Sequence, residues 1–270
     1  MKAAQVTDRV WTALLALRDG AEPLPPRGWS AAEIAAWELY APLARRTGRP
    51  MRVAQIGQSL DGRVATASGD ARDVSGPDGL AHLHRIRALV DAVVIGVRTG
   101  LHDLPRLTVR LVSGRSPARV IIDPRGRLPN DAPSLRGDGA RRVVIQSVDL
   151  ARPDGVEVLR LPAEDGWIAP GAIARALAEA GFMHLLIEGG GITIAGFLEA
   201  QLLDRLHVAV APLIIGAGPT GLTTTPVARL ADALRPETHV YGLGSDILFD
   251  CAVTRPAAAT AAIPAARRGA

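Results

Sequence analysis

The chain has 270 residues, and its 31 basic and 27 acidic residues give a formal net charge of +4. Lys2 is the only lysine, and acidic residues are interleaved with the arginines, so the charge forms no basic tract. Together with an aromatic content of 3%, this pattern argues against a nucleic-acid-binding protein. Cys251 is the single cysteine, which excludes an intramolecular disulfide and any site built from several cysteines of this chain.

No apolar run in the sequence is long enough to cross a membrane, and the chain does not open on the apolar segment of a secretory signal. We therefore expect a cytoplasmic protein with no membrane partner. Residues 256–270 are mostly Ala with Pro, Arg and Gly, a composition that predicts a disordered tail.

Residues 1–50 are predicted to form a helical N-terminal extension. Apolar residues recur at helical spacing from 6 to 17, and three prolines then interrupt the chain at 22–28. A second helix should begin at Ser30, because Ser30 and Glu33 match a capping box ahead of an apolar run. Since three of the four tryptophans lie here, we expect the apolar face of the extension to pack on the main domain or on a partner subunit. The three tryptophans are Trp11, Trp29 and Trp37.

From residue 51 onwards, short apolar strands alternate with helices, a pattern typical of an α/β sheet with helices on both faces. Residues 51–255 are predicted to form one domain around a mixed, mostly parallel sheet, with antiparallel edge strands added by the closing β-rich stretch. Helices are expected at 75–89, 169–180 and 193–200, the second of them stopping at Gly181 in a left-handed cap. Strands are expected at 53–57, 92–97, 119–123, 142–146, 156–159, 184–188 and 206–215, and in a final segment ending near 253.

Two glycine-rich segments follow predicted strands. Residues 216–221 have the spacing of a dinucleotide-binding turn, but the Leu-Thr-Thr-Thr-Pro that follows cannot begin the required helix, which favours a plain loop. Residues 188–191 are a better phosphate cradle, because three glycines join a buried strand to a helix N-terminus. A tight turn without a ligand fits the same spacing equally well. Glu188 favours the cradle, since a carboxylate at the end of a central strand falls where open α/β sheets bind ligands.

Two further segments place polar groups after strands. Residues 59–63 put a charged pair in a turn at the same edge of the sheet, although composition alone would make it a solvated turn. Residues 99–110 are predicted to form a long polar loop, and such loops carry function or are disordered. The six histidines suggest no metal site, because none forms a metal-binding motif and His82 and His84 should point to different sides of one helix.

In order and at similar spacing, several segments resemble the riboflavin-pathway pyrimidine reductases. The resemblance covers about residues 52–253 and is carried by many short motifs rather than by one. The segments are VAQIGQSLDGRVAT (53–66), HRIRA (84–88), DAVVIG (91–96), PRLTVR (105–110), RVIID (119–123), EGGG (188–191), LD (203–204) and APLIIG (211–216).

The resemblance implies a dihydrofolate-reductase-like fold, a homodimer and an activity like that of 5-amino-6-(5-phosphoribosylamino)uracil reductase. Members of that family use NADPH to reduce the ribosyl side chain of an aminopyrimidine ribosylamine 5′-phosphate to the ribityl form. Bifunctional relatives also carry a zinc deaminase domain with H-x-E and P-C-x-x-C motifs. Neither motif occurs in these 270 residues, so we expect the reductase activity alone.

The resemblance also implies which residues form the site. Substrate-binding positions are Asp61, Arg87, Leu107 and Arg110, and the catalytic candidates are Arg63 and Glu188. The arginines offer forked donors that suit a 5′-phosphate. Cofactor-binding positions are Gly57, Thr99, Asp103, Gly190, Gly191, Ile192 and Thr193. Arg125 is added as a candidate for the 2′-phosphate of NADPH, because of its position after a strand.

Two of the departures from the family pattern bear on the alternatives. Leu104 stands where a second acid is usual before the proline, and Asp73 stands where a Trp or related residue is common. Both touch the predicted cofactor loop or substrate rim, so they affect the choice of substrate more than the fold. Two alternatives therefore stay open: a reductase of a pterin or another heterocycle on the same fold, and a non-catalytic member that binds a ligand or a partner.

Overall fold

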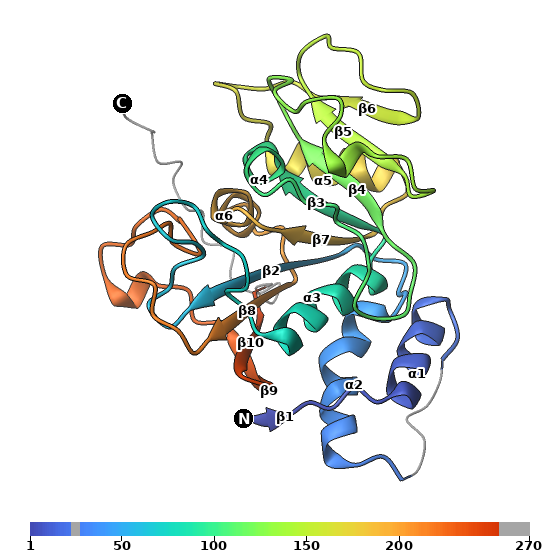
Figure 1. Cartoon of the computed structure of the whole chain (residues 1–270), viewed down its shortest axis with the longest axis vertical. Helices are drawn as coiled ribbons and strands as arrows, with labels where there is room; N and C mark the ends of the chain where they lie inside the picture. The colour runs from blue at the N-terminus through green and yellow to red at the C-terminus, as the bar shows by residue number, and fades with distance from the viewer. Residues whose placement is uncertain (23–27, 254–270) are drawn as a thin grey trace.

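The computed structural model describes residues 1–22 and 28–253, and ten strands in these ranges form one sheet (Figure 1). The strand order is β1-β9-β10-β8-β2-β7-β3-β4-β5-β6. The strands are β1 (Lys2–Ala3), β2 (Met51–Ser59), β3 (Ala92–Gly96), β4 (Ala118–Ile122), β5 (Arg142–Gln146), β6 (Val156–Arg160), β7 (His184–Glu188), β8 (Arg205–Ala211), β9 (Glu237–Leu243) and β10 (Asp246–Ala252). The α-helices are α1 (Asp8–Arg18), α2 (Ala31–Ala44), α3 (Pro77–Leu89), α4 (Val97–His102), α5 (Pro170–Glu179) and α6 (Gly191–Glu199).

The strand pairs from β8 through β2, β7, β3, β4 and β5 to β6 are all parallel. β10 runs antiparallel to both β8 and β9, and β1 pairs with the outer side of β9. The predicted mixed, mostly parallel sheet with an antiparallel C-terminal edge is confirmed. β1 was not predicted, because two residues are too few to show an alternating pattern.

Each face of the sheet has its own core, because successive side chains of a strand point to opposite faces. On β3, Val93 belongs to the core shared with α3 and the N-terminal helices, and Val94 belongs to the core shared with α5 and α6. Helices therefore cover both faces of the parallel part of the sheet, as Figure 1 shows. This arrangement leaves the carboxyl ends of the parallel strands free to form a site at one edge.

The N-terminal extension packs on the main domain. Val10 and Leu14 of α1 share a core with Ile86 of α3. The predicted capping box is confirmed, since the Ser30 hydroxyl accepts from the Glu33 N–H and the Glu33 carboxylate accepts from the Ser30 N–H. Residues 23–27 of the predicted break and the predicted tail at 256–270 lie outside the described residues. Within the described ranges, no helix is long and apolar enough to cross a membrane.

Two predicted boundaries differ most from the structure. β8 ends at Ala211 rather than at residue 215, because Pro212 has no N–H to donate to a strand ladder. Residues 97–102 form α4 instead of a strand end and a loop, and the Asp103 N–H closes its last turn by donating to the Thr99 carbonyl at 3.0 Å. A helix of six residues is too short to show a helical period in the sequence. The left-handed cap at Gly181 is confirmed by its φ of 89°.

Candidate functional site

The glycine turn at residues 189–191 lies in the middle of the edge where the parallel strands end. Gly189 and Gly190 have φ of 62° and 61°, a backbone that residues with side chains rarely adopt. α6 begins directly at Gly191. Its first N–H groups have no acceptor within the helix, so the turn offers backbone donors to an anion.

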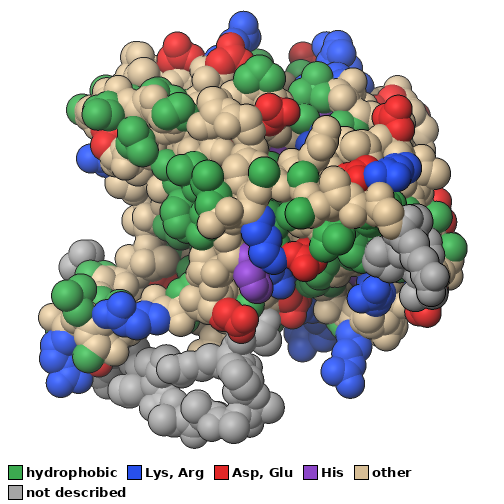
Figure 2. Space-filling model, turned by 90° about the horizontal axis from the view of Figure 1, so that it is seen from below, with side chains coloured by type: hydrophobic (Ala, Val, Ile, Leu, Met, Phe, Trp, Pro, Cys, Tyr) green, Lys and Arg blue, Asp and Glu red, His purple; other side chains and the backbone are tan. Residues whose placement is uncertain are grey.

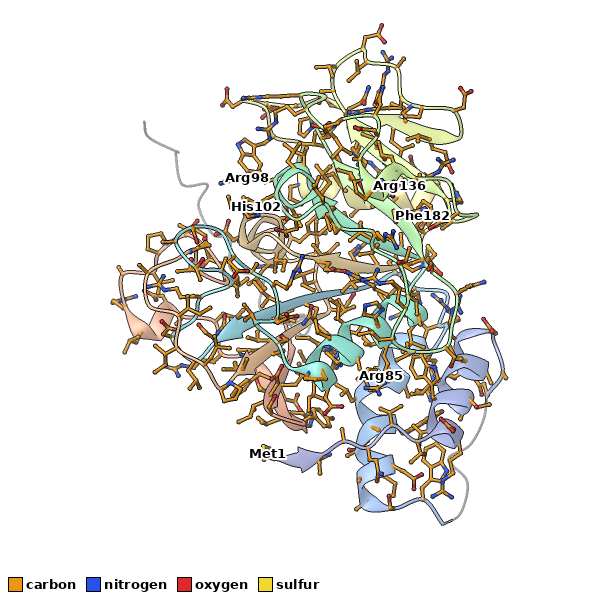
Figure 3. The ribbon with its side chains drawn as sticks, viewed as in Figure 1. Met1, Arg85, Arg98, His102, Arg136 and Phe182 are labelled. Atoms are coloured by element: carbon orange, nitrogen blue, oxygen red, sulfur yellow. The ribbon has the colours of Figure 1, made fainter. Side chains whose placement is uncertain are left out.

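Thr99 lies against this turn. A Cβ on Gly190 would be 3.0 Å from Thr99 Oγ1, and a Cβ on Gly189 would be 2.9 Å from the Thr99 methyl carbon. Thr99 belongs to α4, whose position beside α6 is marked by Arg98 and His102 in Figure 3. The structure thus brings together two predicted cofactor positions, Thr99 and Gly190, that lie far apart in the sequence.

The first turn of α6 adds the predicted positions Ile192 and Thr193. Thr193 packs on Gly96 at the end of β3, where a Cβ would be 2.6 Å from Thr193 Oγ1. Ile192 is 38% exposed, so its side chain is not held in the core. Bare glycine backbone, two threonine hydroxyls and a helix N-terminus form a donor set that fits the phosphates of a dinucleotide cofactor.

The second glycine segment, residues 216–221, forms no helix, which confirms the prediction of a plain loop. It lies against the glycine turn, because the Gly221 carbonyl occupies the space that a Cβ on Gly191 would need. The Gln58 side chain in turn occupies the space of a Cβ on Gly221. The close approach of the Gly221 backbone therefore explains why residue 191 lacks a side chain.

The three remaining predicted cofactor positions lie on β2, after α4 and after β4. Gly57 is on β2, where a Cβ would be 2.6 Å from Ser75 Oγ. Asp103 is exposed and directly follows α4, so it lies at the end of the helix that carries Thr99. Arg125 is exposed after β4 and donates to the Asp165 carbonyl at 3.4 Å. No described contact links Arg125 to the glycine turn.

Arg87 and Glu188 form a buried ion pair. Arg87 Nε donates to Glu188 Oε2 at 2.9 Å, and Arg87 Nη2 donates to Glu188 Oε1. The two side chains are only 6% and 12% exposed. Arg87 Nη1 also donates to the Thr108 carbonyl at 3.1 Å. The carboxylate at the end of β7 is therefore neutralised from α3, and the same guanidinium holds the chain after α4.

Arg110 lies next to this pair and is held through its backbone. The Arg110 N–H donates to Nδ1 of His84 at 2.9 Å, and Arg110 Nη1 donates to Thr108 Oγ1 at 2.8 Å. Burial, with Arg87 and Arg110 nearby, lowers the pKa of His84 to about 4, so its ring stays neutral and Nδ1 can accept. Burial and the charges of Arg87 and Arg106 lower the pKa of Arg110. The region is thus densely positive around a single carboxylate.

Left-handed backbone occurs at three positions near the site. Leu107, Leu104 and Asp73 have φ of 57°, 44° and 59°. Such strain costs on the order of 1 kcal/mol or more per residue and clusters at ligand sites. Leu107, a predicted substrate position, is 1% exposed, so burial of its side chain offsets the strain. Leu104 is 52% exposed and gains no such burial. Both departures from the family pattern, Leu104 and Asp73, therefore fall on strained backbone.

Asp61 and Arg63 join two loops. Asp61 accepts from Ser59 Oγ at 2.5 Å and from the Gly216 N–H at 2.7 Å, and such bonds lower its pKa to about 2. Arg63 Nε and Nη1 donate to the carbonyls of Gly216 and Gly218 at 2.9 and 3.1 Å. Both predicted residues thus tie the turn at 59–63 to the loop at 215–221, and no described contact links them to the buried ion pair.

Sequence reasoning missed a buried cluster at the ends of β4 and β5. The Arg152 and Asp123 side chains are both 0% exposed and pair at 2.7 Å. Arg152 Nε also donates to Gln146 Oε1 at 2.8 Å. Asp123 accepts from the N–H groups of Arg127 and Leu128. The one signal in the sequence was a carboxylate ending an apolar strand, at Asp123.

A second missed cluster crosses the core behind the site. Tyr40 Oη lies 2.7 Å from His82 Nδ1, and His82 Nε2 lies 3.2 Å from His207 Nδ1. His207 Nε2 is 3.1 Å from Asp250 Oδ1, and all four side chains are buried. Burial first, then His207, lowers the pKa of His82 well below its usual range. His82 therefore faces α2 and β8 while His84 faces Arg110, which confirms that the two point to different sides of α3.

Residues 50–249 match the model of the RibD C-terminal domain. A 2,5-diamino-6-ribosylamino-4(3H)-pyrimidinone 5′-phosphate reductase from Methanothermobacter thermautotrophicus is 32% identical over 218 residues, which cover 76% of this chain and 99% of that protein. The riboflavin biosynthesis protein RibD of Aquifex aeolicus is 34% identical over 208 residues, which cover 74% of this chain and 57% of RibD.

A solved structure from Thermotoga maritima, a diaminohydroxyphosphoribosylaminopyrimidine deaminase/5-amino-6-(5-phosphoribosylamino)uracil reductase, has the same fold. It superposes with a TM-score of 0.68 at 25% identity, covering 82% of this chain and 62% of that one. The chain spans about three fifths of such RibD relatives and nearly all of the Methanothermobacter reductase. The matched residues hold the whole candidate site, from Gly57 to the loop at 215–221. The chain therefore belongs to the RibD C-terminal domain family.

Proposed function

We propose that this protein is an NADPH-dependent reductase that converts the ribosyl side chain of an aminopyrimidine ribosylamine 5′-phosphate to its ribityl form. One observation carries the proposal: the glycine turn with Thr99 directly follows Glu188, and Arg87, the partner of Glu188, also binds the segment that carries Arg110. The site thus has a place for a phosphate-bearing cofactor next to a positive place for a phosphorylated substrate. The reductases named among the relatives support the same substrate class.

Thr99, Gly190, Gly191 and Thr193 would hold the cofactor phosphates, with Asp103 at the end of α4 beside them. NADPH, when bound, supplies a hydride to the imine-like carbon of the ring-opened sugar. The protein would position the cofactor and supply complementary charge. Backbone N–H groups would hold the pyrophosphate, and the closely packed edge of the sheet would exclude water from the side of the pyrophosphate that faces the protein. Arg125 reaches the 2′-phosphate in this proposal only if its side chain leaves the Asp165 carbonyl.

At the substrate end, Arg110 would bind the 5′-phosphate, because its guanidinium is exposed while its backbone is fixed by His84. Arg87 balances the charge of Glu188, which leaves that carboxylate able to accept from the polar edge of the pyrimidine. Leu107, whose side chain is buried in the core, would fix the backbone of the segment that leads to Arg110. Arg63 would lie near the sugar, held by the loop at 215–221.

The test is oxidation of NADPH by the full chain in the presence of the ribosylaminopyrimidine phosphate. We expect turnover, and we expect Arg110→Met to raise KM by about 10- to 100-fold, since a charged hydrogen bond to phosphate is worth about 1.5–3 kcal/mol. Arg98→Met, on an exposed position of α4, is the control. Tight NADPH binding without turnover would reject this substrate and favour a pterin or another heterocycle. No binding of NADPH or NADH would favour a non-catalytic member.

We also propose a homodimer. Ile247 and Phe249 on β10 are 39% and 37% exposed, and their cross-strand neighbours Val210 and Val208 on β8 are half-buried. Exposed apolar side chains in register on one sheet face are typical of an interface. Phe249→Glu is expected to shift the mass measured by light scattering from dimer to monomer.

The remaining partner and location predictions belong to the same proposal. On the face seen in Figure 2, basic and acidic side chains of the described residues are intermixed, which suits a protein without a nucleic-acid partner. Cys251 is buried and unpaired, as is common in the reducing cytoplasm. We therefore propose a cytoplasmic enzyme whose partners are a small phosphorylated substrate and a second copy of itself.

A further inference from the structure

The loop that carries Arg110, residues 103–117 and called here the Arg110 loop, is held from two sides. From the main domain, Nδ1 of His84 accepts the Arg110 N–H at 2.9 Å. From the N-terminal extension, the indole Nε1 of Trp11 donates to the Ser113 carbonyl at 2.9 Å. Figure 1 shows α1 lying beside this loop, close to the end of α3. The two bonds flank the segment 110–113, so they fix its backbone at both ends.

Packing reinforces the bond from Trp11. A Cβ on Gly114 would be 2.8 Å from the Ala88 methyl group and 3.7 Å from Leu15 Cδ2. Gly114 also has a φ of 137°, which side chains disfavour. The loop backbone is therefore seated between α3, through Ala88, and α1, through Leu15. Half-buried Val112 packs on the same core as these helices.

Trp11 is suited to hold a loop. Its side chain is buried, with the residue 7% exposed, and its ring contacts Tyr40 edge-on at 6.4 Å. A buried indole N–H needs an acceptor, and here the acceptor is a loop carbonyl rather than a residue of the extension. The match to the RibD C-terminal domain begins at residue 50, so this contact comes from outside the part of the chain that carries the family resemblance.

We propose that α1 is a positioning element of the site: Trp11 holds the Arg110 loop in the conformation that presents Arg110 to the anionic end of the substrate. Trp11 touches neither substrate nor cofactor and acts through the loop. The role of Arg110 rests on the proposed function. The ordering of the loop by Trp11 does not, and it can be measured separately.

The extension contains a matched control. Trp29 is 8% exposed and makes an edge-on contact with Trp37 at 5.5 Å, much as Trp11 does with Tyr40. Its Nε1 has no hydrogen-bond partner among the residues that the structure describes. Trp29→Phe therefore removes an indole N–H of similar burial without removing a bond to the Arg110 loop. Trp11→Phe keeps an aromatic ring in place and removes the bond.

The first measurement is hydrogen–deuterium exchange in the full chain, without substrate. We expect Trp11→Phe to speed exchange of the backbone amides at 107–116 by about three- to tenfold, as the loss of one hydrogen bond predicts. Trp29→Phe should leave these amides unchanged. Unchanged exchange in Trp11→Phe would overturn the proposal, and so would equal acceleration in both variants, which would indicate general loosening of the extension.

The second measurement is the kinetic effect of the same variants. Trp11→Phe should raise KM for the ribosylaminopyrimidine phosphate by about three- to tenfold and change kcat little, because a displaced Arg110 weakens binding in ground and transition states alike. Faster exchange with an unchanged KM would reject the positioning role. If the wild-type protein does not turn over this substrate, the proposed function fails, and the exchange measurement alone then decides whether α1 holds the loop.

Discussion

The guanidinium of Arg87 and the carboxylate of Glu188, 101 residues apart in the chain, face each other in a two-pronged ion pair at the carboxyl end of β7. The family resemblance makes Arg87 a substrate-binding position and Glu188 a catalytic candidate. Because they are bonded to each other, their charges cancel within the protein. The positive charge that would attract a phosphate then comes chiefly from Arg106 and Arg110, on the loop beside them.

Removing one charge of the Arg87–Glu188 pair should destabilise the folded protein. Glu188→Gln is expected to lower the free energy of unfolding by about 3 kcal/mol, because it leaves the Arg87 charge buried and poorly paired. In a double-mutant cycle with Arg87→Met, the double variant should be less destabilised than the sum of the single variants. Denaturant unfolding measures all three. Additive effects would show that the two side chains do not interact energetically.

The buried pair at the end of β4 offers a contrast with an exposed one. Asp123→Asn should lower the free energy of unfolding by about 3–5 kcal/mol, since Arg152 would remain charged and buried. Asp149→Asn is the control, because the Asp149–Arg160 pair is 86% and 55% exposed. The control should unfold like the wild type. If denaturant unfolding gave equal midpoints and equal slopes for the wild type, Asp123→Asn and Asp149→Asn, a structural role for the Arg152 cluster would be contradicted.

Buried neutral histidines should make stability depend on pH. The pKa values of His82, His84 and His184 are lowered, chiefly by burial, and that of His84 falls to about 4. The unfolded chain then binds protons below about pH 6.5 that the folded chain does not, so stability is full above that pH and falls as pH drops towards 4. The slope is up to about 1.4 kcal/mol per pH unit for each histidine.

His84→Asn isolates one of these contributions. The unfolding free energy of this variant should fall less steeply between pH 6.5 and pH 4 than that of the wild type, because one proton-binding site of the unfolded chain is gone. His239→Gln, at an exposed position, is the control and should keep the wild-type slope. Chemical denaturation at several pH values compares the three. A wild-type slope in His84→Asn would mean that His84 titrates alike in both states.

The glycine turn can be tested by adding one methyl group. Gly190→Ala places a Cβ 3.0 Å from Thr99 Oγ1, inside the proposed phosphate space, and should weaken NADPH binding by about tenfold or more. Gly139→Ala has the same kind of backbone strain, with a φ of 88°, but its Cβ meets nothing within 4 Å. The rise in melting temperature with NADPH should shrink in the first variant and persist in the second. An unchanged rise in Gly190→Ala would place the phosphates elsewhere.

Local sequence patterns are enough to predict the order and type of most helices and strands. The strands at 142–146 and 184–188, the cap at Gly181 and the capping box at Ser30 follow from local periodicity, from the backbone freedom of glycine and from short-range hydrogen bonds. Such signals depend only on neighbouring residues, so they can be recognised without knowledge of the fold. The helix at 97–102 was not predicted, because six residues are too few to show a helical period in the sequence.

Which side chains meet depends on how the helices and strands pack together. Arg87 joins Glu188, Arg152 joins Asp123 and Trp11 joins the Ser113 carbonyl across 101, 29 and 102 residues. Thirty arginines offer many possible partners for each carboxylate, and nothing local selects among them. Selection comes from burial, because a charge or an indole N–H enclosed by the packed sheet and helices must find its partner among the few groups that the fold brings within reach.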